Sequence, residues 1–286
     1  MGRRARGGKV NSPDIYFKDH LGDLTCVTSF PSLPNLLAPG IAPLAPVDPK
    51  IPPGEIRVWG CLGAMDEGFD HLLDRLDSKE QERANGYRFP EDRRRFVCAH
   101  VFLRQVLGHH LGFEPGEIVF RSNQWGKLAI ESPSGRELSF NLSHSEEIVL
   151  IAVSTTGEVG VDVELLRDVQ EVDAIVRRQF SAPEQDHVLH ARDRIAAFFE
   201  IWTAKEAYIK GIGRGLFHPL KEFSVVPGPE GEFSSVEDWS ELKTAEDWKV
   251  RKLQLPDPSY AASLATIGDC PFELTTITGA EILALV

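Results

Sequence analysis

Short stretches of the chain either alternate hydrophobic and polar residues with the period of a β-strand or are apolar throughout. The first is IRVWGCLG at 56–63. Further stretches lie at 117–123, 127–131, 138–143, 148–154, 159–166, 221–227, 248–255, 260–268 and 272–278. Runs of this length and pattern predict strands.

Helical spacing of apolar residues marks four segments between these strands: 72–89, 91–112, 173–180 and 194–211. In the second segment the polar residues outside the apolar side include Arg93, Arg94 and Arg104. Its apolar residues on one broad side are Phe96, Ala99, Val101, Phe102, Val106 and Leu107. Helices and strands alternate in both halves of the chain. The pattern therefore predicts an α+β fold of two similar α/β subdomains packed together.

Proline density separates the start of the chain from the rest. Eight prolines fall between residues 31 and 53, and proline removes backbone donors and blocks regular structure. We therefore expect residues 1–53 to form a disordered tail. The remainder divides into an N-terminal subdomain at 54–158 and a C-terminal subdomain at 159–286.

Composition narrows the classes of function. The chain has 286 residues, 42% hydrophobic and 26% charged, which is ordinary for a globular protein. Its formal net charge of −12 argues against nucleic-acid binding, which needs a basic field. The four cysteines are scattered without zinc-like spacing. The first residues include an arginine pair without the apolar run that follows one in an export signal, and no apolar stretch is long enough to cross a membrane. We expect a cytoplasmic protein that binds neither nucleic acid nor membrane.

The strand at 159–166 carries two acidic residues on one face. Asp162 and Glu164 are two positions apart, which puts their side chains on the same side and roughly 7 Å apart along the strand. Carboxylate oxygens in such a pair suit Mg²⁺ or Ca²⁺. A half-buried strand with a solvated polar face produces the same alternation, so the strand alone leaves both interpretations open.

The helix at 194–211 places a carboxylate among apolar residues. Glu206 follows Trp202 by four positions on the stripe that contains Ile195, Phe198, Phe199 and Ile209. A buried carboxylate is costly unless it is paired or binds a metal, and such an inconsistency is typical of functional sites. Lys210 lies one turn further on. An ordinary Glu–Lys pair at the edge of the core is the other interpretation.

Four motifs occur in one order along the chain. They are WGK at 125–127, FNLSHS at 140–145, GVDVE at 160–164 and FFEIWTAKEAYIKGIGRGL at 198–216. Together they resemble the signatures of the 4′-phosphopantetheinyl transferases over about residues 56–286. The resemblance is to the monomeric, surfactin-synthetase-activating type, and it implies a fold in which the two subdomains form a pseudo-dimer.

The resemblance implies a role for each matching residue. Glu206 is then the general base and Lys210 lies near the pyrophosphate of coenzyme A. The Mg²⁺ ligands are Asp162, Glu164 and Glu206. The residues implied to bind coenzyme A are Arg83, Lys127, Ser143, His144, Asp162 and Lys205. Arg95 and Arg104 occupy matching positions without an assigned role.

Two positions depart from the family pattern. Glu80, with Lys79 beside it, stands where the family has a basic residue, so phosphate binding there is expected to be weaker or shifted. Leu128 replaces a proline that often follows the glycine–lysine pair. Neither departure touches the implied metal ligands or base.

The implied reaction moves the 4′-phosphopantetheine group of coenzyme A to a serine of an apo acyl, polyketide or peptidyl carrier protein, with Mg²⁺, and releases 3′,5′-ADP. We expect a monomer. Two other hypotheses remain. One is a non-catalytic module that binds coenzyme A or a carrier protein. The other is a different Mg²⁺-dependent nucleotide phosphotransferase, although the sequence contains no P-loop or kinase motif.

Overall fold

The computed structural model describes residues 50–63, 69–131, 138–225, 234–244 and 246–278. The predicted tail lies outside the described residues up to residue 49. Residues 50–53, also assigned to the tail, are described, and the side chain of Ile51 is buried. The described chain is therefore already packed before the predicted boundary at residue 53.

The first sheet combines strands from both ends of the described chain. Its order is β12 (Phe272–Thr278), β1 (Ile56–Leu62), β5 (Ile148–Ser154) and β4 (Ser139–Ser145). β12 runs parallel to β1, whereas β1–β5 and β5–β4 are antiparallel pairs. Every residue of β1 except the last is buried, which is expected of a strand covered on both faces.

The second sheet is built from the later strands. Its order is β6 (Val159–Leu165), β11 (Tyr260–Ile267), β10 (Trp248–Lys252) and β8 (Ser234–Ser235), all antiparallel. Two smaller pairs complete the strands. They are β2 (Phe120–Ser122) with β3 (Leu128–Ile130), and β7 (Phe223–Ser224) with β9 (Glu237–Asp238).

The two sheets share one hydrophobic core. Val159, Val161 and Val163 on one face of β6 belong to the same buried cluster as Val58 of β1 and Leu150 of β5. β6 therefore points its valines at the first sheet and its acidic residues the other way, as the strand period requires. The predicted strand and its two faces are confirmed.

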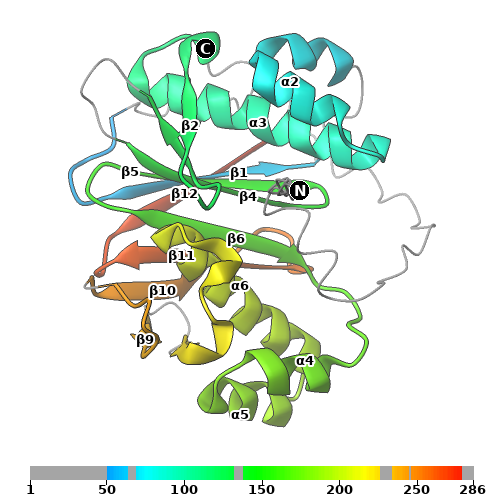
Figure 1. Cartoon of the computed structure of the whole chain (residues 1–286), viewed down its shortest axis with the longest axis vertical. Coiled ribbons are helices and arrows are strands. Elements are labelled where there is room, and N and C mark those ends of the chain that lie inside the picture. The colour runs from blue at the N-terminus through cyan, green and yellow to red at the C-terminus, as the bar shows by residue number, and fades with distance from the viewer. Residues whose placement is uncertain (1–49, 64–68, 132–137, 226–233, 245, 279–286) are drawn as a thin grey trace, which may run out of the picture. The chain divides into compact units, whose positions relative to one another are not determined.

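Helices cover the outer faces of this pair of sheets (Figure 1). α2 (Ser78–Asn85) and α3 (Pro90–Leu111) lie on the side of the first sheet, and the Nε1 of Trp59 in β1 donates to Nε2 of His110 in α3 over 2.9 Å. α6 (Arg194–Ile212) packs on the second sheet. α4 (Val172–Gln179) and α5 (Ala182–His190) flank α6. Mixed helices and sheets confirm the α+β class, whereas the likeness of the two halves stays a proposal.

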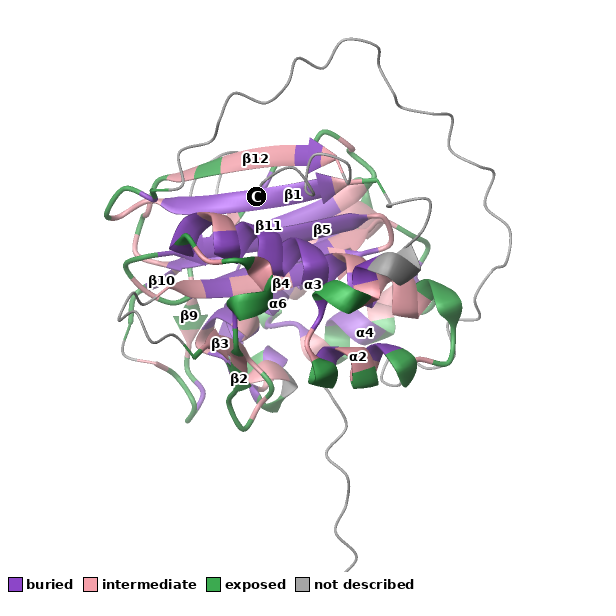
Figure 2. Ribbon diagram, turned by 90° about the horizontal axis from the view of Figure 1, so that it is seen from above, coloured by how far each residue is buried: buried purple, intermediate pink, exposed green. Residues whose placement is uncertain are grey.

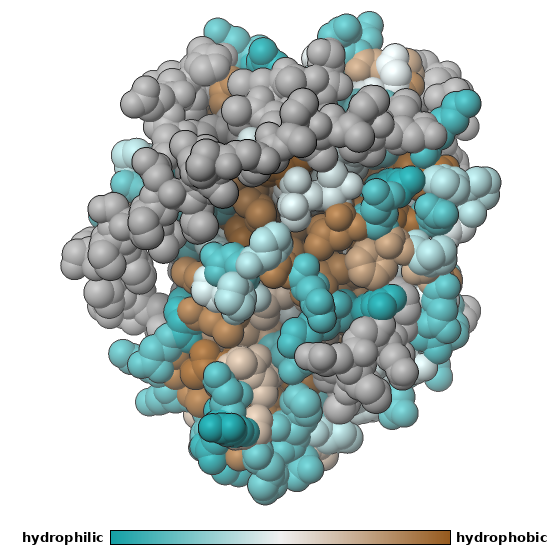
Figure 3. All heavy atoms as spheres, turned by 180° about the vertical axis from the view of Figure 1, so that it is seen from behind, coloured by the Kyte–Doolittle hydropathy of each residue, from teal (hydrophilic) through white to brown (hydrophobic). Residues whose placement is uncertain are grey.

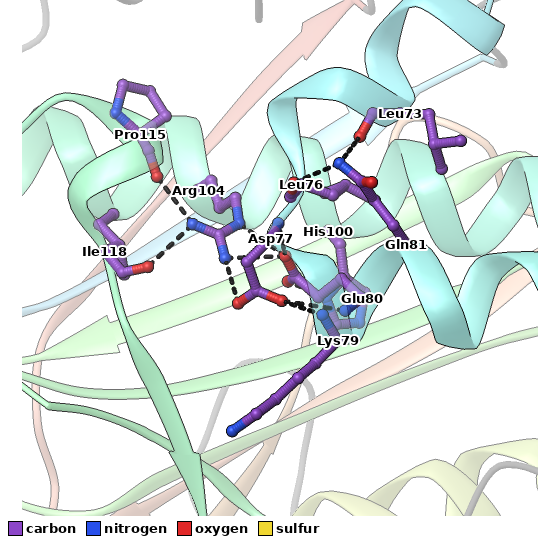
Figure 4. A network of polar contacts seen from close by, with 10 residues as sticks. All are labelled: Leu73, Leu76, Asp77, Lys79, Glu80, Gln81, His100, Arg104, Pro115 and Ile118. Atoms are coloured by element: carbon purple, nitrogen blue, oxygen red, sulfur yellow. Dashed lines mark hydrogen bonds and ion pairs between the residues drawn. The ribbon is translucent and has the colours of Figure 1, made fainter.

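The helix predicted at 72–89 is divided in two. A 3₁₀ segment (Phe69–Arg75) ends before Asp77, which begins α2 as its N-cap and forms a capping box with Glu80. Arg104, one of the polar residues outside the predicted apolar side of α3, is only 1% exposed. Its guanidinium donates to Glu80, to Asp77 and to the carbonyls of Pro115 and Ile118 (Figure 4). Glu80 therefore has a structural partner in Arg104, and weaker phosphate binding at this position stays a prediction.

α6 is buried nearly all round rather than along one stripe (Figure 2). It begins at the N-cap Asp193, whose side chain accepts from the Ala196 N–H, and it ends at Gly213 in the left-handed conformation. A helix enclosed on all sides is apolar all round. The polar residues inside α6 are therefore the ones that need a partner.

The molecular surface has a visible apolar area. The face seen in Figure 3 carries apolar residues near its middle, bordered by hydrophilic ones, within the described part of the chain.

None of the helices that the structure describes is both long enough and apolar enough to cross a bilayer.

Candidate active site

Gly160 sets the distance between β6 and α6. A Cβ atom at this position would collide with the carbonyl oxygen of Ala207 and would lie 2.5 Å from the backbone nitrogen of Gly211. Only glycine allows the strand and the helix to approach this closely. The contact brings the acidic face of β6 against the polar residues of α6.

Asp162 lies at the centre of this contact and is 3% exposed. Its Oδ1 accepts hydrogen bonds from the Lys210 ammonium at 2.7 Å and from the Ser143 hydroxyl at 2.8 Å. Its Oδ2 is buried without a hydrogen-bond partner. Burial raises the pKa of Asp162, although Lys210 and Ser143 oppose the shift.

Glu164 is two residues further along the same face of β6. The hydroxyl of Ser145 donates to its Oε2 over 3.0 Å. Burial, followed by the nearby charge of Asp162, raises the pKa of Glu164 to about 7, with Arg167 acting in the opposite direction. Glu164 is therefore close enough to Asp162 for the two charges to repel.

Glu206 comes from α6 and is 4% exposed. Its Oε1 is buried and has no hydrogen-bond partner. Burial raises the pKa of Glu206 well above its usual value, and the charges of Asp162 and Glu164 raise it further, while Lys210 lowers it. Three carboxylates and one ammonium thus share a single electrostatic environment.

These groups suit a divalent cation, although they are not arranged as a finished metal site. Among the described residues, no three His, Cys, Asp or Glu side chains are close enough together to hold a metal. The Lys210 ammonium binds Oδ1 of Asp162, and the Ser145 hydroxyl binds Oε2 of Glu164. The remaining oxygens Asp162 Oδ2 and Glu206 Oε1 are buried and unpaired. Buried anionic oxygens without donors are costly, and Mg²⁺ prefers such oxygens as ligands.

A pocket on the other face of β4 contains the predicted phosphate-binding histidine. His144 lines it together with Arg94 and Arg95 of α3. The other lining residues are Cys61, Gly63, Cys98, Phe102, Glu146, Glu147 and Val149. Because alternate residues of a strand face opposite sides, Ser143 faces β6 and His144 faces α3.

Both arginines of this pocket are paired with acidic residues of the β4–β5 turn. Arg94 lies 3.1 Å from Glu147, and Arg95 pairs with Glu146 and with Asp92. An anion that enters the pocket would meet His144 and would compete with these carboxylates for the guanidinium groups.

Lys127 lies at the C-terminal end of α6. Its ammonium donates to the Gly211 carbonyl over 2.6 Å and pairs with Glu158. Burial lowers the pKa of Lys127, and Glu158 opposes the shift. The amide of Asn123 donates to the Gly213 carbonyl over 2.9 Å. The turn between β2 and β3 therefore caps the last carbonyls of α6.

The sequence of the chain matches two family models and several known proteins. Residues 158–265 match the family model of the 4′-phosphopantetheinyl transferase superfamily, and residues 63–156 match that of the 4′-phosphopantetheinyl transferase N-terminal domain. The chain is 34% identical over 218 residues to 4′-phosphopantetheinyl transferase HetI of Nostoc sp., covering 75% of this chain and 88% of that protein. The chain belongs to the 4′-phosphopantetheinyl transferase superfamily. 4′-Phosphopantetheinyl transferase Sfp of Bacillus subtilis is 27% identical over 218 residues, 75% of this chain and 92% of Sfp.

Membership of the superfamily does not give every implied residue a place in the site. Lys205 is fully buried, and its ammonium donates to both oxygens of Glu184 and to the Phe223 carbonyl at 2.7–2.8 Å. These bonds use all three of its donors. Burial lowers the pKa of Lys205 to about 8, opposed by Glu184. The implied contact of Lys205 with coenzyme A does not agree with this arrangement, and the residue instead fixes α6 to α5.

Arg83 and Arg104 also have structural partners. The Arg83 guanidinium lies over the Phe96 ring, 4.8 Å from its centre, at the end of α2. Arg83 is not among the described residues that line the His144 pocket. Its role in phosphate binding stays a prediction of the phosphopantetheinyl transferase motifs. Arg104 has its donors occupied by the network of Figure 4.

Proposed function

We propose that this chain transfers the 4′-phosphopantetheine group of coenzyme A to a serine hydroxyl of an apo acyl, polyketide or peptidyl carrier protein. The observation that carries the proposal is the gathering of Asp162, Glu164, Glu206 and Lys210 in one buried environment. These residues come from the two signatures that the superfamily shares. A module that only binds coenzyme A or a carrier protein would gain nothing from burying these carboxylates, whose desolvation costs free energy.

The reaction divides among the residues of this chain. The serine oxygen attacks the phosphorus that carries pantetheine, and the bond from that phosphorus to the bridging oxygen of the pyrophosphate breaks. 3′,5′-ADP leaves with the electron pair. Glu206, a carboxylate buried on α6 with its Oε1 unpaired, accepts the serine proton directly or through a water. Lys210 stabilises the charge on the leaving group.

Asp162, Glu164 and Glu206 would hold Mg²⁺ once their side chains turn toward one ion, because no three such side chains of the described residues are close enough together in the structure. When bound, the ion neutralises charge on the pyrophosphate oxygens. His144 would bind a phosphate of coenzyme A from the pocket on the far side of β4. Catalysis then rests on position and electrostatics, as in other phosphoryl transfers.

Intact-mass measurement of a carrier protein tests the proposal. An apo carrier protein is incubated with the chain, coenzyme A and Mg²⁺, and its mass should rise by one phosphopantetheine group. A carrier whose acceptor serine is replaced by alanine is the matched control and should keep its mass. Binding of coenzyme A or of the carrier without any gain in mass, across fatty-acid, polyketide and peptide carriers, would instead favour the non-catalytic module.

The oligomeric state and the cellular location stay predictions from the sequence. Sedimentation of the full chain tests the monomer, and fractionation of cells that express it tests the cytoplasmic location.

A further inference from the structure

β4 and β6 lie side by side but belong to different sheets. Side chains take the place of backbone pairing between them. Asn141 Oδ1 accepts from the Val161 N–H at 2.9 Å, and Ser145 Oγ accepts from the Leu165 N–H at 3.1 Å. Between these two, Ser143 Oγ accepts from the Val163 N–H at 3.3 Å. Every second residue of β4 thus binds every second N–H of β6. We call these three contacts the β4–β6 ladder.

The two serines of the β4–β6 ladder do more than join the strands. Each hydroxyl also donates to a carboxylate of β6: Ser143 to Asp162 and Ser145 to Glu164. A hydroxyl has a single proton. Because the Leu165 N–H also binds Ser145 Oγ, rotation of the whole Ser145 side chain about χ1 away from Glu164 would break two hydrogen bonds rather than one.

Ser145 is itself held firmly. It is 8% exposed, and it directly precedes the β4–β5 turn, in which Glu146 has the positive φ of 48°. The contacts of Asn141 within the described chain differ in one respect. Asn141 binds the β6 backbone but no carboxylate. The ladder therefore contains a member that only joins the strands and a member that also binds Glu164.

We infer that Ser145 is a positioning residue, whose hydroxyl fixes the Glu164 carboxylate beside Asp162 and Glu206 for binding a divalent cation. The inference rests on the proposed function, since it assigns that site its cation. Ser145 does not touch the reacting atoms. It acts through Glu164, in the way that hydrogen-bonded neighbours orient the ligands of metal sites.

Direct binding of Mn²⁺ separates this role from strand joining. The full chain, without coenzyme A, is titrated with Mn²⁺ and the free ion is followed by electron paramagnetic resonance. Ser145→Ala should weaken Mn²⁺ binding by roughly 10–100-fold, the usual loss when a partner of a metal ligand is removed. Ser145→Thr keeps the hydroxyl and should restore binding. Asn141→Ala removes one strand contact and should bind Mn²⁺ like the unaltered chain.

Thermal unfolding of each variant controls for stability, because both alanine variants leave one backbone N–H of β6 without its partner. If Ser145→Ala does not fold, Ser145→Cys replaces it, since a thiol is a weak donor. Equal Mn²⁺ affinity in the Ser145 and Asn141 variants would overturn the inference. So would an unaltered chain that binds no Mn²⁺. The mass assay of the unaltered chain reports the proposed function separately, so that transfer with an indifferent Ser145 variant would refute the inference alone.

Discussion

At the scale of single residues, the site is a concentration of negative charge that the protein only partly compensates. Lys210 supplies one positive charge and binds Asp162, but Asp162 Oδ2 and Glu206 Oε1 are left buried without donors. Removing an ionised carboxylate from water is costly unless a partner replaces the lost solvent. A cation that reached these two oxygens would offset part of that cost.

Replacement of Glu206 by glutamine should abolish transfer. The amide has nearly the same shape, so the fold should survive, but it has neither the basicity nor the charge of the carboxylate. We expect a loss of at least 100-fold in kcat, in line with the usual contribution of a general base. Single-turnover mass spectrometry of the carrier measures it. Glu200→Gln, on the same helix beside Lys252, is the control and should keep its rate. A Glu206 variant with a normal rate would remove this residue as the base.

Glu80 gives a pH dependence that can be measured. Burial tends to raise its pKa, but hydrogen bonds and charges from His100 and Arg104 outweigh burial and hold it below 4.5. Because the folded pKa lies below the unfolded one, these interactions stabilise the fold fully above pH 4.5 and are lost as the pH falls through the folded pKa.

Glu80→Gln should therefore lower the free energy of unfolding by roughly 3 kcal/mol at neutral pH, the lower end of the cost of breaking a buried ion pair, since the buried Arg104 keeps only Asp77 as a charged partner. The deficit should shrink in acid below pH 4.5. Urea unfolding at both pH values measures it, with the exposed neighbour Glu82→Gln as control. A deficit that does not change with pH would show that Glu80 stabilises by packing rather than by charge.

Sequence reasoning worked best for charged residues that the apolar pattern places in the core. Glu206 was predicted from its place among apolar neighbours, and the structure confirms that it is buried. Lys205, one position before it, carries the same kind of signal. Its partner Glu184 is 21 positions away on another helix, and no pattern along the chain links the two. Ser145 was missed for a similar reason, although polar residues at 141, 143 and 145 are its trace in the sequence.

At the scale of elements, the site depends on how closely α6 approaches β6. Gly160 faces the Ala207 carbonyl, and Gly211 faces the ring of Trp248, to which an added Cβ would come within 2.6 Å. Gly160 thus lets α6 approach β6, and Gly211 lets α6 approach Trp248 of β10. The distance from the carboxylates of β6 to Glu206 follows from this contact.

Gly160→Ala should push α6 away from β6. The obstructing atoms belong to the backbone and cannot rotate aside, so we expect a loss of about 3 kcal/mol in the free energy of unfolding, the upper part of the usual range for overpacking. Mn²⁺ binding should weaken as well. Chemical denaturation measures the first effect. Gly157→Ala is the control, because its Cβ would meet Ile267 at an ordinary 3.4 Å. Equal stability of both variants would contradict the close contact.

The prediction of elements failed where a local signal was outweighed or overlooked. The segment 72–89 has helical spacing throughout, but Asp77 and Glu80 form a capping box that begins a new helix there. α5 was not predicted, although Ser181, Pro183 and Glu184 are a typical helix start. Long periodic segments such as α3 and the strands β1, β5, β6 and β11 were predicted within a few residues, because their burial dictates their pattern.

At the scale of the whole molecule, the first sheet depends on a strand from the far end of the sequence. β12 pairs with β1 along seven positions, from Ile56 with Phe272 to Leu62 with Thr278. Phe272 and Leu274 also pack against the shared core. No sequence pattern indicated this partner, because pairing between distant strands leaves no local periodicity. The division at residues 158 and 159 stays a prediction, yet one strand after it belongs to the sheet before it.

Deletion of residues 271–286 should therefore destabilise the N-terminal half. β1 would lose its parallel neighbour and expose a row of backbone groups as an edge. We expect loss of the cooperative thermal transition, followed by circular dichroism, together with aggregation. Deletion of residues 1–49 is the control, which the proline-rich sequence predicts to be neutral. A chain without β12 that melts cooperatively near the temperature of the full chain would show that the strand is dispensable.

The same pairing has a consequence for synthesis on the ribosome. β1 emerges early, but its partner is translated more than 200 residues later, as the separation of Ile56 and Phe272 shows. The first sheet cannot close until almost the whole described chain has been made. Until then the edge of an apolar strand is unpaired, and chaperones or other nascent chains can bind to it. We expect slow translation or a missing chaperone to harm the yield of this protein more than that of one whose first domain closes on itself.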